Sequence, residues 1–248
     1  MTPAFPILVL LVAPGAPSAS AVEVGYRHEL LTRGADWREV DVEAAWQPAD
    51  RTGLRLGARG LERFERRDLD LRASGSAPLG PRWTVAAEAS ASPRHRVVPA
   101  FTGGASLQRA LGRRFVASGG VRWSRWDTEV ATADAALGSL GLEVYWGPFR
   151  LGWTGMLGTL DGEWAAGNVL AWDHYRGDRD RIGVILAAGR ELESTGGPAP
   201  LVSTVLAAAV RGQQGLGAAW VLTYEVSIQR QGDLFTRGGA RLGIRRSF

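Results

Sequence analysis

The sequence predicts an all-β protein: a closed antiparallel transmembrane β-barrel of about fourteen strands. Three observations carry this prediction. A short apolar segment near the start resembles an export signal, apolar and polar residues alternate in segments of roughly ten residues through the rest of the chain, and the last residue is phenylalanine. A tilted strand crosses a bilayer in about 9–11 residues, which is the length of these segments.

The composition argues against several other classes of protein. The 248 residues contain no cysteine, which excludes a disulfide framework, thiolate zinc sites and cysteine nucleophiles. After residue 13 no uncharged apolar run is long enough for a transmembrane helix. All 29 basic residues are arginine, they are spread along the chain, and the net charge is only +4. We therefore expect no nucleic-acid-binding patch.

Residues 1–21 are predicted to be a signal peptide that is removed on export, which leaves a barrel domain over residues 22–248. Phe5–Val12 form an apolar core, and Ala19-Ser20-Ala21 has the small-residue pattern of a cleavage site. The first four residues depart from the usual pattern because they carry no positive charge. The alternative interpretation is a short buried strand of a cytoplasmic protein.

The alternation assigns each residue to one of two faces. In the segment 37–46, Val40 and Val42 share a face with Trp46, while Glu39 and Asp41 lie on the opposite face. A soluble β-sandwich also alternates, with its apolar face in a core. Two features favour a barrel with lipid outside and a polar lumen: aromatic residues near the segment ends, where an interfacial belt would lie, and a polar face that mixes glycine with both charge signs.

The polar face provides the candidate site. Its ionisable residues would line or plug the lumen and form ion pairs between neighbouring strands. These residues are Arg27, Glu39, Asp41, Glu43, Arg55, Arg59, Asp70, Arg72, Glu88, Arg122, Glu143, Arg150, Glu225, Arg241 and Arg245.

Fourteen segments can be counted, and an even number returns both termini to one side, as in bacterial barrels. The predicted strands are 22–31, 37–47, 53–64, 68–78, 82–92, 100–111, 114–126, 130–146, 149–159, 164–175, 180–191, 200–211, 216–229 and 234–248. Twelve strands are the alternative, if two hairpins are merged. If the start lies on the periplasmic side, the connections there include Gly212–Gly215, and they are short and contain the residues that tight turns need.

Two local features do not follow the simple pattern. In the segment 130–146, Ala133, Ala135 and Leu137 share one phase, whereas later apolar residues share the other. We predict a β-bulge near Gly138-Ser139 that changes the phase. Arg109 falls on the apolar face and would extend toward the headgroups. Trp37 and Trp126 lie near segment ends and are expected in the aromatic belts.

The last strand resembles the C-terminal signature of bacterial outer-membrane barrels, which the barrel-assembly machinery reads. Counting back by twos from Phe248 places Arg246, Ile244 and Leu242 on the outer face. The signature usually has an aromatic or apolar residue where Arg246 stands. Phe248, Ile244 and Leu242 are therefore the predicted assembly signal.

Several short motifs, in this order, resemble the YaiO family of outer-membrane barrels. They are Gly25-Tyr26-Arg27, Trp37-Arg38-Glu39, 89–93, 141–147, 189–193 and 235–239. The resemblance implies an integral barrel of the bacterial outer membrane with no assigned activity and no cofactor. A barrel in this membrane contacts its lipid, and the basic loop Pro93-Arg94-His95-Arg96 is expected to face anionic lipopolysaccharide. Because some similar barrels occur in proteins linked to polysaccharide export, envelope polysaccharide is a further candidate partner.

Three functions are compatible with this sequence. The leading hypothesis is a small pore or structural barrel, the second is polysaccharide binding or export, and the third is a lipid esterase at the rim. The esterase would use His95 with Ser90 or Ser92 and with Glu29 or Glu88. Asp173, Asp178 and Asp180 around Arg176 and Arg179 lack calcium-loop spacing, so salt bridges are expected there and no metal site.

Overall fold

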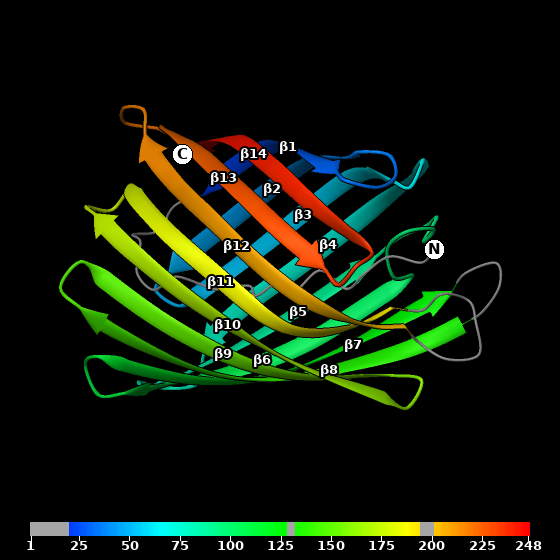
Figure 1. Cartoon of the computed structure of the whole chain (residues 1–248). Coiled ribbons are helices and arrows are strands. Elements are labelled where there is room, and N and C mark those ends of the chain that lie inside the picture. The colour runs from blue at the N-terminus through cyan, green and yellow to red at the C-terminus, as the bar shows by residue number, and fades with distance from the viewer. Residues whose placement is uncertain (1–19, 128–131, 194–200) are drawn as a thin grey trace.

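The computed structural model describes residues 20–127, 132–193 and 201–248, which form a closed barrel of antiparallel strands (Figure 1). The strands are β1 (Ala21–Leu31), β2 (Trp37–Ala49), β3 (Thr52–Arg63), β4 (Arg66–Pro78), β5 (Trp83–Ala91), β6 (Phe101–Leu111), β7 (Phe115–Asp127), β8 (Thr132–Trp146), β9 (Phe149–Leu160), β10 (Glu163–Arg176), β11 (Asp180–Glu193), β12 (Leu201–Gly215), β13 (Trp220–Gln231) and β14 (Phe235–Ser247). The predicted fold class and the count of fourteen are confirmed, and the twelve-strand alternative is wrong.

Each strand pairs with its neighbours in the sequence, and β1 pairs with β14 to close the sheet. The closing ladder runs from Ala21 opposite Ser247 to Leu31 opposite Arg237 without a break. The Phe248 N–H continues it by donating a hydrogen bond to the Ser20 carbonyl at 2.8 Å. Among the described residues no helix is long and apolar enough to cross a membrane.

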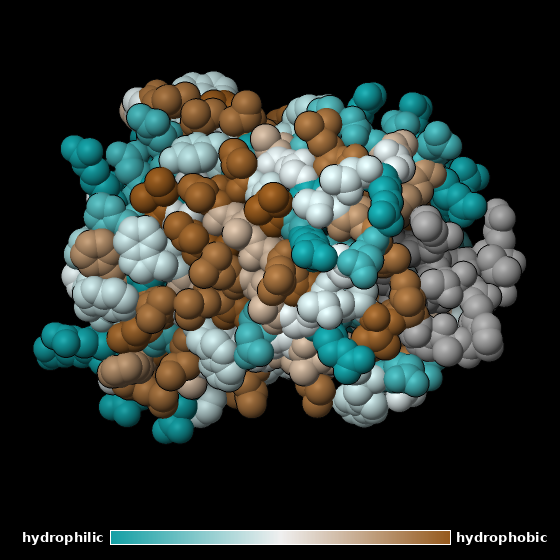
Figure 2. Space-filling model, viewed as in Figure 1, coloured by the Kyte–Doolittle hydropathy of each residue, from teal (hydrophilic) through white to brown (hydrophobic). Residues whose placement is uncertain are grey.

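The outer face of the barrel is apolar, as the alternation predicts. Val121 and Leu140 are each 68% exposed, whereas Arg150 and Asp173 on the inner face are fully buried. Figure 2 shows hydrophobic side chains gathered over the strands, with most of the hydrophilic ones toward the two ends of the barrel. This polarity is the reverse of that in a soluble protein and fits a barrel surrounded by lipid.

The two ends of the barrel differ. Both described termini lie at one end, together with short connections such as Gly147-Pro148, where Gly147 has a φ of +55°. The opposite end carries longer connections, among them residues 32–36 and 92–100. Bacterial barrels keep their short turns in the periplasm. We therefore assign the end with the termini to the periplasm and the other end to the cell exterior.

The prediction of a turn at Gly212–Gly215 is wrong, because these residues belong to β12. Gln213 pairs with Thr223 and Gly215 pairs with Val221. The turn lies at residues 216–219, where Gly217 has a φ of +100°. Glycine favours a turn in this stretch, but of Gly212, Gly215 and Gly217 only Gly217 has a positive φ, the conformation that favours glycine.

The predicted bulge at Gly138-Ser139 is also wrong. Gly138 pairs with Val121 on one side and Leu157 on the other, within two ladders that show no register shift. A register shift occurs instead between Trp46 and Ala49 of β2. Because β8 keeps one phase, Ala133 and Ala135 point into the barrel, where they are 4% and 6% exposed.

Aromatic side chains on the outer face gather near the periplasmic turns. Phe149 lies with its ring centroid 6.0 Å from Trp146 and 4.9 Å from His174. Arg109 faces outward as expected, with its guanidinium 5.0 Å from the centre of the Trp83 ring. This contact places the charge of Arg109 at an aromatic residue of the belt rather than in bare lipid.

Trp37 and Trp126 are not belt residues. Their side chains are 2% and 5% exposed and lie on the inner face. Trp37 packs edge-on against Phe64, with Arg63 over its ring at 4.7 Å. Both residues lie near a strand end, as a belt requires, but the alternation of side chains along each strand places both rings in the lumen.

The outer face of β14 carries the predicted assembly signal. Phe248, Leu242 and Ile244 are 70%, 60% and 38% exposed. The guanidinium of Arg246 lies 5.5 Å from the Trp220 ring and 5.0 Å from the Phe248 ring. These cation–π contacts explain how a charged residue occupies a position that is usually apolar. Recognition of this strand by the assembly machinery stays a prediction.

Candidate functional site in the barrel lumen

The ladders place all the residues predicted to line the lumen on the inner face of the sheet. Residues paired across neighbouring strands point to the same face of the sheet, and this alternation, which we call parity, continues from strand to strand. Arg27 pairs with Glu39 and with Arg241, and Arg59 pairs with Asp70. A further pairing joins Arg211 to Glu225. The structure brings these side chains together in three groups of ion pairs and two isolated pairs, Arg55–Glu43 and Arg122–Glu88.

The first group spans the closing strands. Arg241 Nη2 lies 2.7 Å from Asp41 Oδ2 on β2 and 3.0 Å from Glu23 Oε1 on β1. Beside it, Arg27 Nη1 lies 2.8 Å from Glu225 Oε1. These contacts connect β1 and β2 with β13 and β14 across the seam of the barrel. They are charge-assisted bonds between partly buried groups, the stronger class of hydrogen bond.

The second group lies on β2, β3 and β4. Asp70, 3% exposed, is shared by Arg59 at 3.0 Å and Arg72 at 2.6 Å. Arg59 also lies 3.4 Å from Glu39. Toward the periplasm, Arg55 and Glu43 form a looser pair at 3.3 Å, in which each side chain is about half exposed. The charges of this second group therefore pack tightly around Asp70, nearer the outer mouth, and those of the separate pair Arg55 and Glu43 pack more openly.

The third group surrounds Asp173 and has an excess of positive charge. Arg150 lies 3.2 Å from Asp173 and 3.5 Å from Glu143, and both Arg150 and Asp173 are fully buried. Arg211 and Arg181 approach the other carboxylate oxygen at 3.4 and 3.9 Å. Asp173 is thus a β10 residue inside the lumen rather than part of a turn with Asp178 and Asp180.

The remaining predicted residues have separate partners. Arg122 on β7 donates to Glu88 on β5 at 2.7 Å, which ties together two strands that are not adjacent. Arg245 donates to Gln213 at 2.7 Å and lies 3.9 Å from Glu23. Within the described ranges no group of three His, Asp or Glu side chains could hold a metal ion.

The connection between β5 and β6 folds into the outer mouth of the lumen. Val97 and Val98 are 2% and 5% exposed and pack with Leu61 and Phe64. Both of their backbone N–H groups donate to Asp68 Oδ2, at 2.6 and 3.1 Å. A buried carboxylate on the barrel wall therefore holds this loop, residues 92–100, across part of the bore.

Four of the candidate esterase residues, His95, Ser92, Glu29 and Glu88, are engaged in other contacts. The His95 backbone N–H donates to Ser92 Oγ at 3.0 Å, and the His95 ring nitrogen Nδ1 lies 3.2 Å from the Ser92 carbonyl oxygen. A catalytic relay needs the ring at the hydroxyl. Glu29 is paired with Arg237 and Glu88 with Arg122. The serine and histidine thus form a turn.

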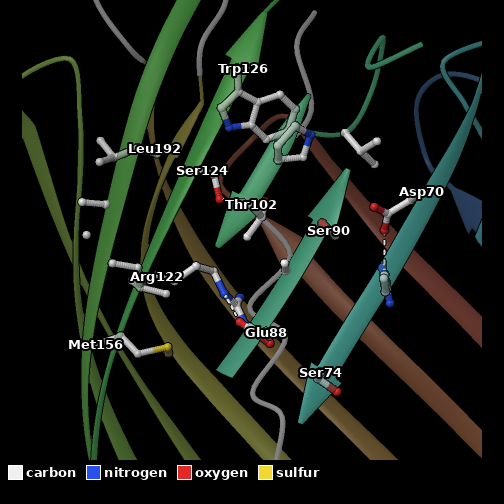
Figure 3. A pocket seen from close by; sticks show the side chains of 18 of the residues that line it. Asp70, Ser74, Glu88, Ser90, Thr102, Arg122, Ser124, Trp126, Met156 and Leu192 are labelled. Atoms are coloured by element: carbon white, nitrogen blue, oxygen red, sulfur yellow. Dashed lines mark hydrogen bonds and ion pairs between the residues drawn. The ribbon is translucent and has the colours of Figure 1, made fainter. Parts of the chain in front are cut away.

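A cavity of about 230 Å³ lies in the lumen below this loop. Val98 and Pro99 of the loop contribute to its lining, together with residues of several strands. In Figure 3, Trp126, Leu192 and Met156 lie on one side of the cavity, and Ser74, Asp70 and Ser90 lie on the other. The bore is therefore only partly filled by side chains.

Sequence reasoning missed several residues of the lumen. Glu23, Arg63, Arg181, Arg211 and Arg237 take part in the ion pairs described above or in equivalent ones, such as Arg63 with Glu39 at 3.6 Å. Glu23, Arg63 and Arg237 lie an even number of residues from predicted lumen residues on their own strands, so counting by twos from those residues identifies them. Arg181 and Arg211 lie on β11 and β12, for which the sequence analysis names no lumen residue, and only the pairing with neighbouring strands places them inside.

We predict that Asp173→Asn destabilises the barrel by about 3–5 kcal/mol, because it leaves three arginines around a buried position without their shared carboxylate. The free energy of unfolding, measured by denaturant titration in lipid vesicles, tests this. Asp233→Asn is the matched control, since Asp233 pairs with Arg230 in a fully exposed position. Equal stability of the two variants would contradict the account.

Comparisons with known proteins agree with this architecture. Among solved structures, a monoaromatic hydrocarbon channel, CymD, superimposes with a TM-score of 0.60 at 9% identity, covering 93% of this chain and 88% of its own. A loop-deletion mutant of OmpT, an outer membrane protein of Vibrio cholerae, gives 0.55 at 9% identity, covering 92% and 98%. The KdgM porin, solved with oligogalacturonate, gives 0.51 at 12% identity, covering 91% and 99%.

At these identities the solved structures show the fold alone. The comparison with curated proteins found no match. The family described as the YaiO membrane beta barrel domain matches residues 19–193, which is most of the chain. Together with the closed barrel, the match places the protein in the bacterial outer membrane, and the chain belongs to the YaiO membrane beta barrel family.

Proposed function

We propose that this outer-membrane barrel is a channel for small solutes, narrowed at its outer mouth by the loop 92–100. The observation that carries the proposal is the cavity of about 230 Å³ inside the bore, next to charged side chains that remain accessible. Glu43 and Arg55 have side-chain exposures of 46% and 49%, although both point inward. Barrels of eight strands are filled by side chains, whereas larger ones leave an aqueous space.

The charge pairs narrow the bore and would make it selective among charged solutes. Paired charges hold the side chains against the wall and leave both signs near the passing solute. The similar structures include a hydrocarbon channel and a porin, which is compatible with this proposal. A purely structural barrel, or one that contacts envelope polysaccharide through its outer loops, would need no such open space.

The first test is conductance in planar bilayers. We expect discrete channels whose preference shifts toward anions in Glu43→Arg, because this change places two arginines where a balanced pair lines the bore. Glu65→Arg in the exposed β3–β4 turn controls for net charge and should leave the selectivity unchanged. A bilayer that stays silent with correctly folded protein would overturn the channel and favour the structural or surface-binding role.

The second test concerns the loop. Asp68→Ala removes the acceptor of the Val97 and Val98 N–H groups, so we expect the loop to leave the bore and the unitary conductance to rise. Asp36→Ala, in another outer connection, is the control. If Asp68→Ala gives channels identical to those of the unmodified protein, the loop 92–100 does not restrict the bore.

A further inference from the structure

The lumen cavity has two chemically different walls. One wall is apolar and is formed by Trp126 on β7, Leu137 on β8, Met156 on β9 and Leu192 on β11. The other wall carries hydroxyl and charged groups from β4 to β7, among them Arg72, Ser90 and Arg122. In Figure 3, the labelled apolar side chains lie on the left and top, and Ser74 and Asp70 lie on the right.

The apolar wall is unusual for a face that elsewhere carries paired charges. It exists because β8 contains no bulge, so the side chains of Ala133, Ala135 and Leu137 all point into the bore. Nearer the mouth, Trp126 packs with buried Ala133, Ala135, Leu160, Ala165 and Leu192. Leu137 and Met156 extend this apolar surface into the cavity. Contact between water and an apolar surface is unfavourable, so an apolar ligand group is favoured there.

The size of the cavity limits the ligand. An apolar cavity of roughly 150 Å³ accepts a benzene molecule. The space here is about 230 Å³. One aromatic ring or a short alkyl chain, together with a small polar group, therefore fits, whereas a sugar chain or a lipid does not fit inside it.

The polar wall has spare hydrogen-bond donors. Arg72 donates from Nε to Asp70, but Asp70 also binds Arg59, so two guanidinium groups share one carboxylate. A guanidinium carries five N–H donors. Across the described ranges, the two terminal nitrogens of Arg72 make no hydrogen bond to the protein, and the side chain is 36% exposed. Ser90 stands directly opposite Arg72 on β5.

The carboxylates of the polar wall are already engaged. Glu88 accepts from Arg122, and Glu43 is paired with Arg55. Glu191 lies across the cavity at the apolar side and is 5% exposed. Free donors on Arg72 and Ser90 therefore favour an anionic group over a cationic one on the polar wall.

We propose that the cavity is a binding site for small organic anions with an apolar body, namely aromatic or short-alkyl monocarboxylates. The carboxylate accepts hydrogen bonds from the terminal nitrogens of Arg72 and from the Ser90 hydroxyl, and the apolar body lies on Leu137, Met156 and Trp126. This site deepens the proposed channel by naming the class of solute, although binding itself does not require conduction.

The test is isothermal titration calorimetry of the full folded chain in detergent micelles with phenylacetate as the probe. Three compounds divide its chemistry: acetate has the charge without the ring, benzyl alcohol has the ring without the charge, and phenethylamine has the opposite charge. We expect phenylacetate to bind at least about tenfold more tightly than each of the three, because only phenylacetate satisfies both walls.

Two pairs of variants locate the site. Arg72→Gln should weaken phenylacetate binding by about tenfold or more, the loss expected for a hydrogen bond to a charged group. Arg245→Gln removes an inner-face arginine of similar exposure outside the cavity and should have no effect. Leu137→Ser should weaken the binding of phenylacetate and leave the binding of acetate unimproved. Leu140→Ser, on the outer face, should leave the binding of phenylacetate unchanged. A mobility difference between unheated and boiled samples confirms that each variant is a closed barrel.

Three outcomes would overturn the proposal: phenethylamine binding as tightly as phenylacetate, equal effects of Arg72→Gln and Arg245→Gln, or no saturable binding to the unmodified chain. These outcomes are separate from failure of the channel. Saturable binding by a barrel that is silent in bilayers would remove the channel and keep the site. Conductance without binding would remove the site and keep the channel.

Discussion

The structure depends on the closure of one hydrogen-bonded sheet within the hydrocarbon region of the membrane, which offers no hydrogen bonds. Backbone N–H and C=O groups in the hydrocarbon region need partners within the protein, and only a sheet without edges provides them all. The ladder between β1 and β14 meets this need. Because closure requires nearly continuous ladders, parity passes from strand to strand around the barrel, and it decides whether each side chain meets lipid or the lumen.

The alternation of side chains along the strands gives the lumen a charged surface and an apolar surface. On most strands it delivers arginine and carboxylate side chains to the interior, where they form networks such as that around Asp70. On β8 and its neighbours it delivers alanine, leucine and methionine instead. The charge networks hold long side chains against the wall, and the small residues leave space. Together with the loop held by Asp68, these features produce a narrow, chemically two-sided cavity rather than an open pore or a packed core.

The fold was largely predictable because alternation is a local property that survives without any tertiary information. The fourteen strands and the outward direction of Arg109 and Phe248 follow from it, whereas the family is indicated by the order of short motifs such as Gly25-Tyr26-Arg27. Errors arose where residue type and parity disagreed. Ala133 and Leu137 are apolar, and Trp37 and Trp126 lie near strand ends where a belt is expected, yet unbroken ladders turn all of them inward. The partners of Asp173 and the loop bonded to Asp68 join distant segments, which no local pattern specifies.

The inside-out polarity can be measured directly because the chain contains no cysteine. Single cysteines at Leu71, Arg72, Ala73 and Ser74 of β4 can carry a nitroxide spin label in lipid vesicles. Collision rates with oxygen, which concentrates in lipid, and with a water-soluble nickel complex should alternate. The account predicts oxygen access at positions 71 and 73 and nickel access at 72 and 74. The reverse order, or equal access to both reagents at all four positions, would contradict a lipid-facing apolar surface around a hydrated lumen.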